Sequence, residues 1–296
     1  MSVDVLITQK KLFKTNLDLT FVQAMCKSLG LAYGISNEAY ALEDYEGGND
    51  VRGTVLVLYD PKKFARGFRF WPKENCQDCV LRLGTPATNE DIGNFYECVR
   101  YLCKALGADT FLQDDETTYS VKQIDGLSAN IKTWNASQIR KYQVQKNPIT
   151  LGARYPVAIE PHFIETLATL PDSELPGYLS AYLQEKQKPD CYYAKAGIYK
   201  NQETGTRLGA YSVTSGVPTI FPLSPYIPLA CGVDINTPID EWRVSLVKLE
   251  NGNGEVLGRM SFQDFVVKYR LADRQRFDAN HVIIRLSIDE MRELLK

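Results

Sequence analysis

One long segment of the chain, from Leu208 to Val233, contains no charged side chain. It is long enough for a membrane-spanning helix, which needs about 20 apolar residues. However, prolines occur in it at positions 218, 222, 225 and 228, and each proline removes a backbone donor and breaks a helix. We therefore expect no membrane contact here, but a buried strand followed by an apolar, proline-rich loop.

Three of these prolines, Pro222, Pro225 and Pro228, recur at every third residue. This spacing aligns one face of a polyproline II segment, the conformation that aromatic grooves of partner proteins recognise. The apolar residues between them favour burial, so the sequence predicts a packed loop. The alternative is an exposed apolar patch that meets a partner.

The first part of the chain predicts a mixture of strands and helices. Thr20 and Gln23 have capping-box spacing for a helix that ends at Gly30, and Thr88 and Asp91 have it for a helix that ends at Gly107. Strands are expected at residues 3–7, 33–42, 54–59, 68–71 and 80–83.

The second part predicts two hairpins and several short helices. The hairpins pair residues 192–199 with 207–213, and 244–249 with 255–259, and an Asn251-Gly252 turn lies in the second. Helices are expected at residues 124–145, 161–167 and 175–183, and two more begin at Ser261 and Ser287 around a strand at 281–286.

Strands and helices do not alternate regularly, so the predicted class is α+β rather than a doubly wound α/β fold. We expect two mixed units with mostly antiparallel strands and helices packed on the sheets. The change from strands to helix near Gln123 predicts an N-terminal unit of residues 1–122 and a C-terminal unit of residues 123–296.

Composition excludes several classes of protein. The 296 residues carry 34 Lys and Arg against 36 Asp and Glu, a net charge of -2, so the chain is neither a polycation nor a long acidic tail. Its 7 cysteines are an odd number, and the N-terminus lacks a signal-peptide pattern. We therefore expect free thiols in the cytoplasm.

Histidine limits the possible chemistry, because the chain contains only His162 and His281. A Ser-His-Asp or Cys-His site would need one of them. His162 follows Pro161 at an expected helix start, and His281 opens an apolar strand. Since neither carries the surrounding pattern of a nucleophile and base, we interpret both as structural or surface residues, and no catalytic residue is assigned.

Cys76 and Cys79 form a single C-x-x-C pair. Two thiolates at this spacing can hold one side of a zinc site, but the sequence supplies no second pair of ligands. The pair also precedes a strand, whereas a redox pair begins a helix that follows one. We therefore expect inert thiols, with no metal and no cofactor.

Residues 62–70 interleave basic and aromatic side chains. Arg66-Gly67-Phe68 begins like an RNA-recognition strand, but Arg69 and Trp71 depart from that motif. A sequence pI of about 5.9 also lacks the electrostatic footprint of phosphate binding. We expect a half-exposed edge strand and no nucleic-acid partner.

The stretch Leu58-Tyr59-Asp60-Pro61, followed by Ala65-Arg66-Gly67-Phe68, resembles a family of uncharacterised bacterial proteins of about this length, domain of unknown function 4299. The opening Met-Ser-Val-Asp-Val-Leu-Ile, with Lys10 and Lys11 soon after, is also similar. The resemblance implies a bacterial cytosolic protein. It brings no activity, cofactor or catalytic residue.

Two functional hypotheses remain open. The first is a non-catalytic protein-interaction module that binds a protein partner or associates with itself. No catalytic constellation is evident in the sequence, and Tyr and Trp suit interfaces. The second is a hydrolase or transferase whose site assembles between the two halves around His162 or His281. A small-ligand-binding module lies between these two.

Overall fold

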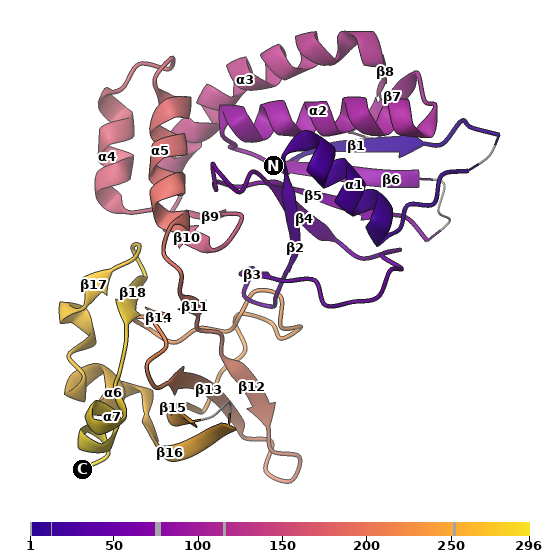
Figure 1. Cartoon of the computed structure of the whole chain (residues 1–296). Helices are drawn as coiled ribbons and strands as arrows, with labels where there is room; N and C mark the ends of the chain where they lie inside the picture. The colour runs from indigo at the N-terminus through magenta and orange to yellow at the C-terminus, as the bar shows by residue number, and fades with distance from the viewer. Residues whose placement is uncertain (1, 13, 75–77, 115–116, 251–252) are drawn as a thin grey trace. The chain divides into compact units, whose positions relative to one another are not determined.

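The computed structural model describes residues 2–12, 14–74, 78–114, 117–250 and 253–296 (Figure 1). By its internal contacts the chain divides into two compact units. The first is formed by Met1–Ser36 and Leu42–Lys188, and the second by Asn37–Ala41 and Pro189–Lys296. The boundary expected after residue 122 falls inside the first unit, within the short helix η1 (Val121–Gln123). Where independently folding domains begin and end stays a prediction.

The first unit is built on an eight-stranded sheet with the order β3-β2-β4-β5-β6-β1-β7-β8. Each strand is antiparallel to its neighbours. The strands are β1 (Ser2–Thr8), β2 (Ala32–Ser36), β3 (Leu42–Glu43), β4 (Leu56–Tyr59), β5 (Phe68–Pro72), β6 (Asp78–Gly84), β7 (Thr110–Gln113) and β8 (Thr117–Ser120).

One face of this sheet forms a hydrophobic core with helices α1 (Leu19–Leu29) and α2 (Asn89–Leu106) (Figure 1). Alternate residues of β1 point into it, since Val3, Val5 and Ile7 are buried while their neighbours are not. Helix α2 has Thr88 as its N-cap and the left-handed Gly107 as its C-cap, as the sequence predicts.

Helix α3 (Ile124–Arg140) packs along α2. It leads to the remaining elements of the unit, which surround a smaller core of their own. These are η2 (Lys141–Val144), β9 (Ile149–Leu151), β10 (Pro156–Ala158), α4 (Pro161–Thr169) and α5 (Leu175–Gln187).

Two local predictions for this unit are wrong. Helix α1 is capped by Asp18, whose side chain accepts from the Phe21 N–H, and Thr20 lies inside the helix. The basic and aromatic stretch does not form an edge strand, because β5 pairs with both β4 and β6. Its aromatic residues Phe68 and Phe70 therefore point into the core.

The second unit contains two four-stranded sheets, with the orders β11-β14-β18-β17 and β12-β13-β15-β16. All neighbouring pairs are antiparallel except β11 with β14 and β13 with β15. The strands are β11 (Tyr192–Tyr193), β12 (Gly197–Lys200), β13 (Arg207–Thr214), β14 (Thr219–Pro222), β15 (Glu241–Glu250), β16 (Asn253–Ser261), β17 (Gln275–Arg276) and β18 (His281–Ile284).

Helices α6 (Phe262–Lys268) and α7 (Ile288–Leu294), with η3 (Leu271–Asp273) between them, complete this unit. Its core is strongly aromatic, and Tyr211, Phe221 and Phe265 are among its fully buried side chains. Both predicted hairpins are present, as β12–β13 and β15–β16, but the first is shorter than predicted, because residues 192–193 form β11 of the other sheet. The turn residues Asn251 and Gly252 lie outside the described residues.

The α+β class and the predominance of antiparallel strands are confirmed. The charge-free segment forms most of β13, all of β14 and the loop that follows, as its prolines predict. Among the residues that the structure describes, no helix has both the length and the apolar character to cross a membrane.

Candidate functional site

His281 lies at the start of β18, beside a turn built by Asp278. One carboxylate oxygen of Asp278, Oδ1, accepts hydrogen bonds from the backbone N–H groups of Asn280 and His281, both at 2.8 Å. It also lies 2.9 Å from Nδ1 of the His281 ring. Asp278 is 1% exposed and His281 5%. An ionised carboxylate only accepts hydrogen bonds, so the contact with Asp278 places the ring proton on Nδ1. Nε2 of a neutral imidazole is then a hydrogen-bond acceptor.

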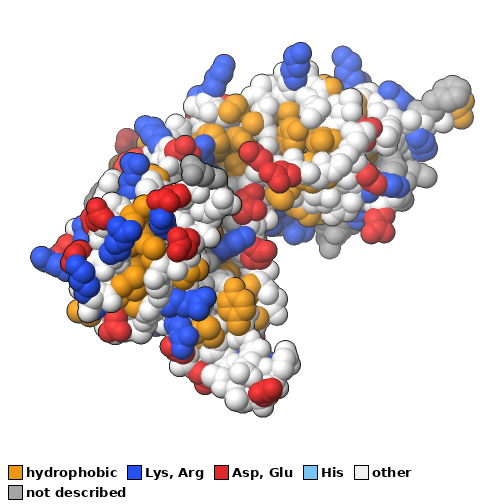
Figure 2. Space-filling model, turned by 60° about the horizontal axis from the view of Figure 1, so that its bottom comes forward, with side chains coloured by type: hydrophobic (Ala, Val, Ile, Leu, Met, Phe, Trp, Pro, Cys, Tyr) orange, Lys and Arg blue, Asp and Glu red, His pale blue; other side chains and the backbone are white. Residues whose placement is uncertain are grey.

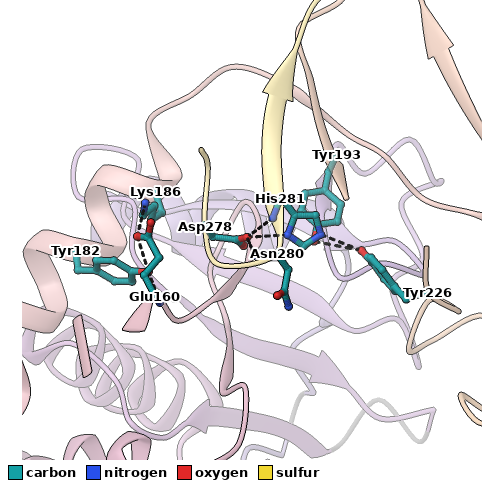
Figure 3. Close-up of polar contacts among 8 residues, drawn as sticks. All are labelled: Glu160, Tyr182, Lys186, Tyr193, Tyr226, Asp278, Asn280 and His281. Atoms are coloured by element: carbon teal, nitrogen blue, oxygen red, sulfur yellow. Dashed lines mark hydrogen bonds and ion pairs between the residues drawn. The ribbon is translucent and has the colours of Figure 1, made fainter. Parts of the chain in front are cut away.

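Nε2 of His281 faces two tyrosine hydroxyl groups (Figure 3). The Tyr193 hydroxyl, from β11, is 3.0 Å away, and the Tyr226 hydroxyl, from the loop after β14, is 3.4 Å away. The two hydroxyl oxygens are 3.3 Å apart. The four side chains therefore form a continuous hydrogen-bonded array, Asp278–His281–Tyr193–Tyr226, which we call the His281 array.

The proline-rich loop places Tyr226 in this array. The backbone N–H of Tyr226 donates to the Tyr211 hydroxyl, and its carbonyl accepts from the same hydroxyl, both at 3.2 Å. Pro228 is buried and Pro225 half-buried, which confirms the predicted packed loop, whereas Pro222 belongs to strand β14. The prolines thus restrict the conformation of the loop that carries Tyr226.

Burial controls the protonation of these phenols. It raises the pKa of Tyr193 well above its usual value, and the neighbouring Tyr226 and Asp278 act in the same direction. Burial also raises the pKa of Tyr226. Both hydroxyls therefore keep their protons at neutral pH and can donate along the array.

His162 is exposed on α4 in the first unit, so the two histidines belong to different units. The backbone carbonyl of His162 accepts from the Thr166 hydroxyl at 2.9 Å, an ordinary contact within a helix. Of the two histidines singled out in the sequence, His281 is the one that the structure surrounds with polar partners.

A second polar cluster lies in the first unit, where α5 meets the start of α4 (Figure 3). Lys186 Nζ is 2.7 Å from Glu160 Oε2, and the side chains are 12% and 16% exposed. The Tyr182 hydroxyl donates to the same carboxylate at 3.2 Å and accepts from the Glu160 N–H at 3.3 Å. Because Glu160 immediately precedes α4, these contacts fix that helix to α5.

Four of the six described cysteines lie in the core of the first unit. Cys79 points into the core of the first unit, and its expected partner Cys76 lies outside the described residues. Cys26, Cys98 and Cys103 are buried in the same core, and burial raises the pKa of the Cys26 and Cys103 thiols to about 12. Within the described residues, no group of three or more His, Cys, Asp or Glu side chains could hold a metal ion.

A groove of about 440 Å³ opens on the first unit, along α2 and α3. Its charged lining has both signs, with Lys63, Lys132, Asp60, Glu90, Glu97 and Asp125. Neither histidine lines it. The groove is therefore a separate polar surface from the His281 array.

The Arg66-Gly67 motif has a structural explanation. The backbone N–H groups of Arg66 and Gly67 donate to the buried Asp91 carboxylate at 3.1 and 2.9 Å. The buried Arg66 guanidinium donates to the backbone carbonyls of Leu151 and Pro86. Gly67 has a φ of +63°, and a Cβ there would lie 2.4 Å from the Leu58 carbonyl oxygen. This motif therefore holds β5 against α2 and β9.

The family model described as Domain of unknown function (DUF4299) matches residues 2–294. The chain belongs to this family. Because the DUF4299 match spans nearly the whole chain, it includes both the Arg66-Gly67 motif and the His281 array. Neither a curated protein nor a solved structure matches the chain.

Sequence reasoning singled out His281 but missed Asp278, Tyr193 and Tyr226. A local signal for Asp278 was present, because Asp-Ala-Asn before a strand is typical of a turn in which the Asp side chain binds the backbone. The tyrosines gave no such signal, since strand pairing and a long loop bring them to the histidine.

Proposed function

We propose that this DUF4299 protein is a protein-interaction module that binds a partner, or a second copy of itself, through one face of the β12-β13-β15-β16 sheet. The sheet is amphipathic. One face carries Tyr211, Val213, Val244 and Leu246 into the aromatic core. The opposite face, which we call the open face, has no buried side chain on the described residues of these strands.

The observation that carries the proposal is the pairing of apolar side chains on the open face. Tyr199 lies opposite Leu208, and Val247 lies opposite Val256. Tyr199 is 61% exposed and Val256 48%. Between these pairs lie the small residues Ser212 and Ser245, which face each other across the parallel β13 and β15. Two arginines lie on the same face, Arg259 opposite Ser245 and Arg243 opposite Ala210. Tyr and Arg are both enriched in protein interfaces, so this combination suits docking of a protein surface.

The second unit supports this choice more widely. On the side drawn in Figure 2, hydrophobic side chains reach the surface in patches bordered by Lys, Arg, Asp and Glu. Among the described residues of this unit, further large apolar side chains are exposed at Leu229, Ile235 and Leu249. The free thiols of the buried Cys26, Cys79, Cys98 and Cys103 are compatible with the cytoplasmic site of action that we include in the proposal.

A matched pair of valine substitutions tests the proposal. Val256→Lys introduces a charge on the open face, whereas Val267→Lys introduces it at an exposed valine of α6 in the same unit. A photo-crosslinker at Ser245 in the native host would identify the partner, and light scattering would measure self-association. We expect Val256→Lys to weaken the association about tenfold or more, and Val267→Lys to leave it unchanged. A monomer that crosslinks to nothing, or equal losses for both variants, would contradict the proposal.

A further inference from the structure

The His281 array meets the geometric requirement for a general base acting on a hydroxyl group. Such a base needs one ring nitrogen fixed by an orienting group and the other within reach of the hydroxyl. Oδ1 of Asp278 lies 2.9 Å from Nδ1 of His281 and orients the ring. Nε2 lies 3.0 Å from one tyrosine hydroxyl and 3.4 Å from another.

The two tyrosines of the array differ in exposure. Tyr193, in β11, is 4% exposed and belongs to the interior. Tyr226 is half-buried and ends the array on the side away from Asp278 (Figure 3). We propose that Tyr226 is a nucleophile toward ester-type acyl groups, with His281 as its general base and Asp278 as the positioning residue.

The step is balanced by the groups of the array and the ester. The Tyr226 oxygen attacks the ester carbonyl carbon, while its proton passes to Nε2 of His281. The C–O bond of the ester then breaks, and the leaving alkoxide takes that proton from His281. The products are an acylated Tyr226 and an alcohol, and the imidazole returns to its neutral form.

The surroundings of Tyr226 favour proton transfer during attack over a preformed phenolate. Burial raises the pKa of Tyr226, the hydrogen bond with Tyr193 lowers it by less, and the Asp278 carboxylate raises it. The phenol is therefore neutral at rest, and a base must remove its proton as the bond forms. The groups that face His281 are Asp278 from the turn, Tyr193 from β11 and Tyr226 from the loop, with Tyr211 of β13 bound to the Tyr226 backbone.

The experiment uses p-nitrophenyl acetate as the acyl donor and the whole chain as the protein. After a short reaction and an acid quench, peptide mass spectrometry measures the acetylation rate of each tyrosine. The more exposed Tyr192 and Tyr199, at 45% and 61%, are internal controls. General-base assistance is worth at least about 100-fold, so we expect Tyr226 to react about 100-fold faster than Tyr199 in the folded protein. In urea, all tyrosines should react alike.

Two variants test whether the fast reaction of Tyr226 depends on His281. His281→Gln should remove the advantage of Tyr226 over Tyr199. His162→Gln, the same change at the exposed histidine of α4, should preserve it. The comparison within the wild-type chain needs no variant, so it decides the matter even if His281→Gln does not fold. Reaction of Tyr226 no faster than Tyr199, or an unchanged rate in folded His281→Gln, would overturn the proposal. Neither result bears on the open face.

Discussion

At Gly67, both the backbone conformation and the available space require a residue without a Cβ. Its φ is +63°, and a Cβ would lie 2.4 Å from the Leu58 carbonyl oxygen. Gly30 offers a matched control, because its φ is +68° and nothing lies within 4 Å of the Cβ position.

We expect Gly67→Ala to lower the free energy of unfolding by about 1–3 kcal/mol more than Gly30→Ala does. Both variants bear the cost of a left-handed alanine, about 1–2 kcal/mol, but Gly67→Ala also forces overlap with backbone. Urea denaturation of the two variants measures the difference. Equal losses would show that the Leu58 strand moves aside at little cost.

The thiols should divide into two classes by burial. Cys26, Cys79, Cys98 and Cys103 are buried, and burial raises the pKa of each. Cys191 and Cys231 are half-exposed. Because the thiolate is the reactive form, we expect a thiol-specific reagent at pH 8 to label Cys191 and Cys231 before the buried four.

Peptide mapping after short labelling checks this order. The four buried thiols should react at a comparable rate only after unfolding in urea, which provides the control. Fast labelling of Cys79 in the native protein would show that the core of the first unit opens at this strand.

At this scale the sequence allowed single residues to be identified but not their partners. The shortage of histidine directed attention to His281, and its three partners lie at 278, 193 and 226. Only Asp278 is local. Pairing of β14 with β18 and of β11 with β14 brings Tyr193 to the histidine, and such pairing between distant segments has no short-range signature.

Single elements show how reliably caps are encoded locally. Helix α7 begins with a full capping box, in which the Ser287 hydroxyl accepts from the Glu290 N–H and the Glu290 carboxylate accepts from the Ser287 N–H. Hydrogen bonds from the Ser287 backbone and side chain lower the pKa of Glu290.

We expect Ser287→Ala to cost about 1 kcal/mol and to raise the pKa of Glu290 toward its ordinary value. Since the folded pKa of Glu290 is lowered, its contribution to stability is present above the ordinary value of 4.5 and is lost as the pH falls below it. NMR titration of the Glu290 carboxyl and urea denaturation at neutral pH measure the two effects. The Ser287 backbone N–H remains in this variant, so an unchanged pKa would mean that the Ser287 hydroxyl does not bind the carboxylate in solution.

Elements with a strong periodic pattern or a defined turn were predictable, and short ones were not. Helix α2 has an apolar face and caps at both ends, and the β15–β16 hairpin has alternating strands, so each could be located from sequence. Strands β7 and β8, of four residues each, were missed because they are too short to show a period. Strand β5 was placed at an edge because the alternation of Arg and Phe does not reveal a second neighbouring strand.

For the whole molecule, the division into units predicts which fragments fold. A fragment ending at residue 122 would lose Ile124 and Leu127, which are buried in the core of the first unit. It would also lose the buried Asn135. Its side-chain amide accepts a hydrogen bond from the Ala87 N–H at 2.9 Å and donates one to the Ala87 carbonyl at 2.7 Å.

We therefore expect residues 1–188 to give a cooperative urea transition and residues 1–122 to aggregate or unfold without one. Circular dichroism and size-exclusion chromatography of the two fragments measure this. A stable, cooperatively folded 1–122 fragment would support the boundary predicted from sequence and would show that the first core does not need α3.

Segment Asn37–Ala41 has a consequence for how the protein is made. These five residues belong to the second unit, where Lys195 pairs with Glu38 at 2.7 Å and the Ala230 N–H donates to the Glu38 carbonyl. On the ribosome they emerge long before residues 189–296, which are added at about 5–20 residues per second. The first unit can therefore form early, but the second cannot be completed until the last part of the chain has left the ribosome and closed around a segment that was synthesised near the start.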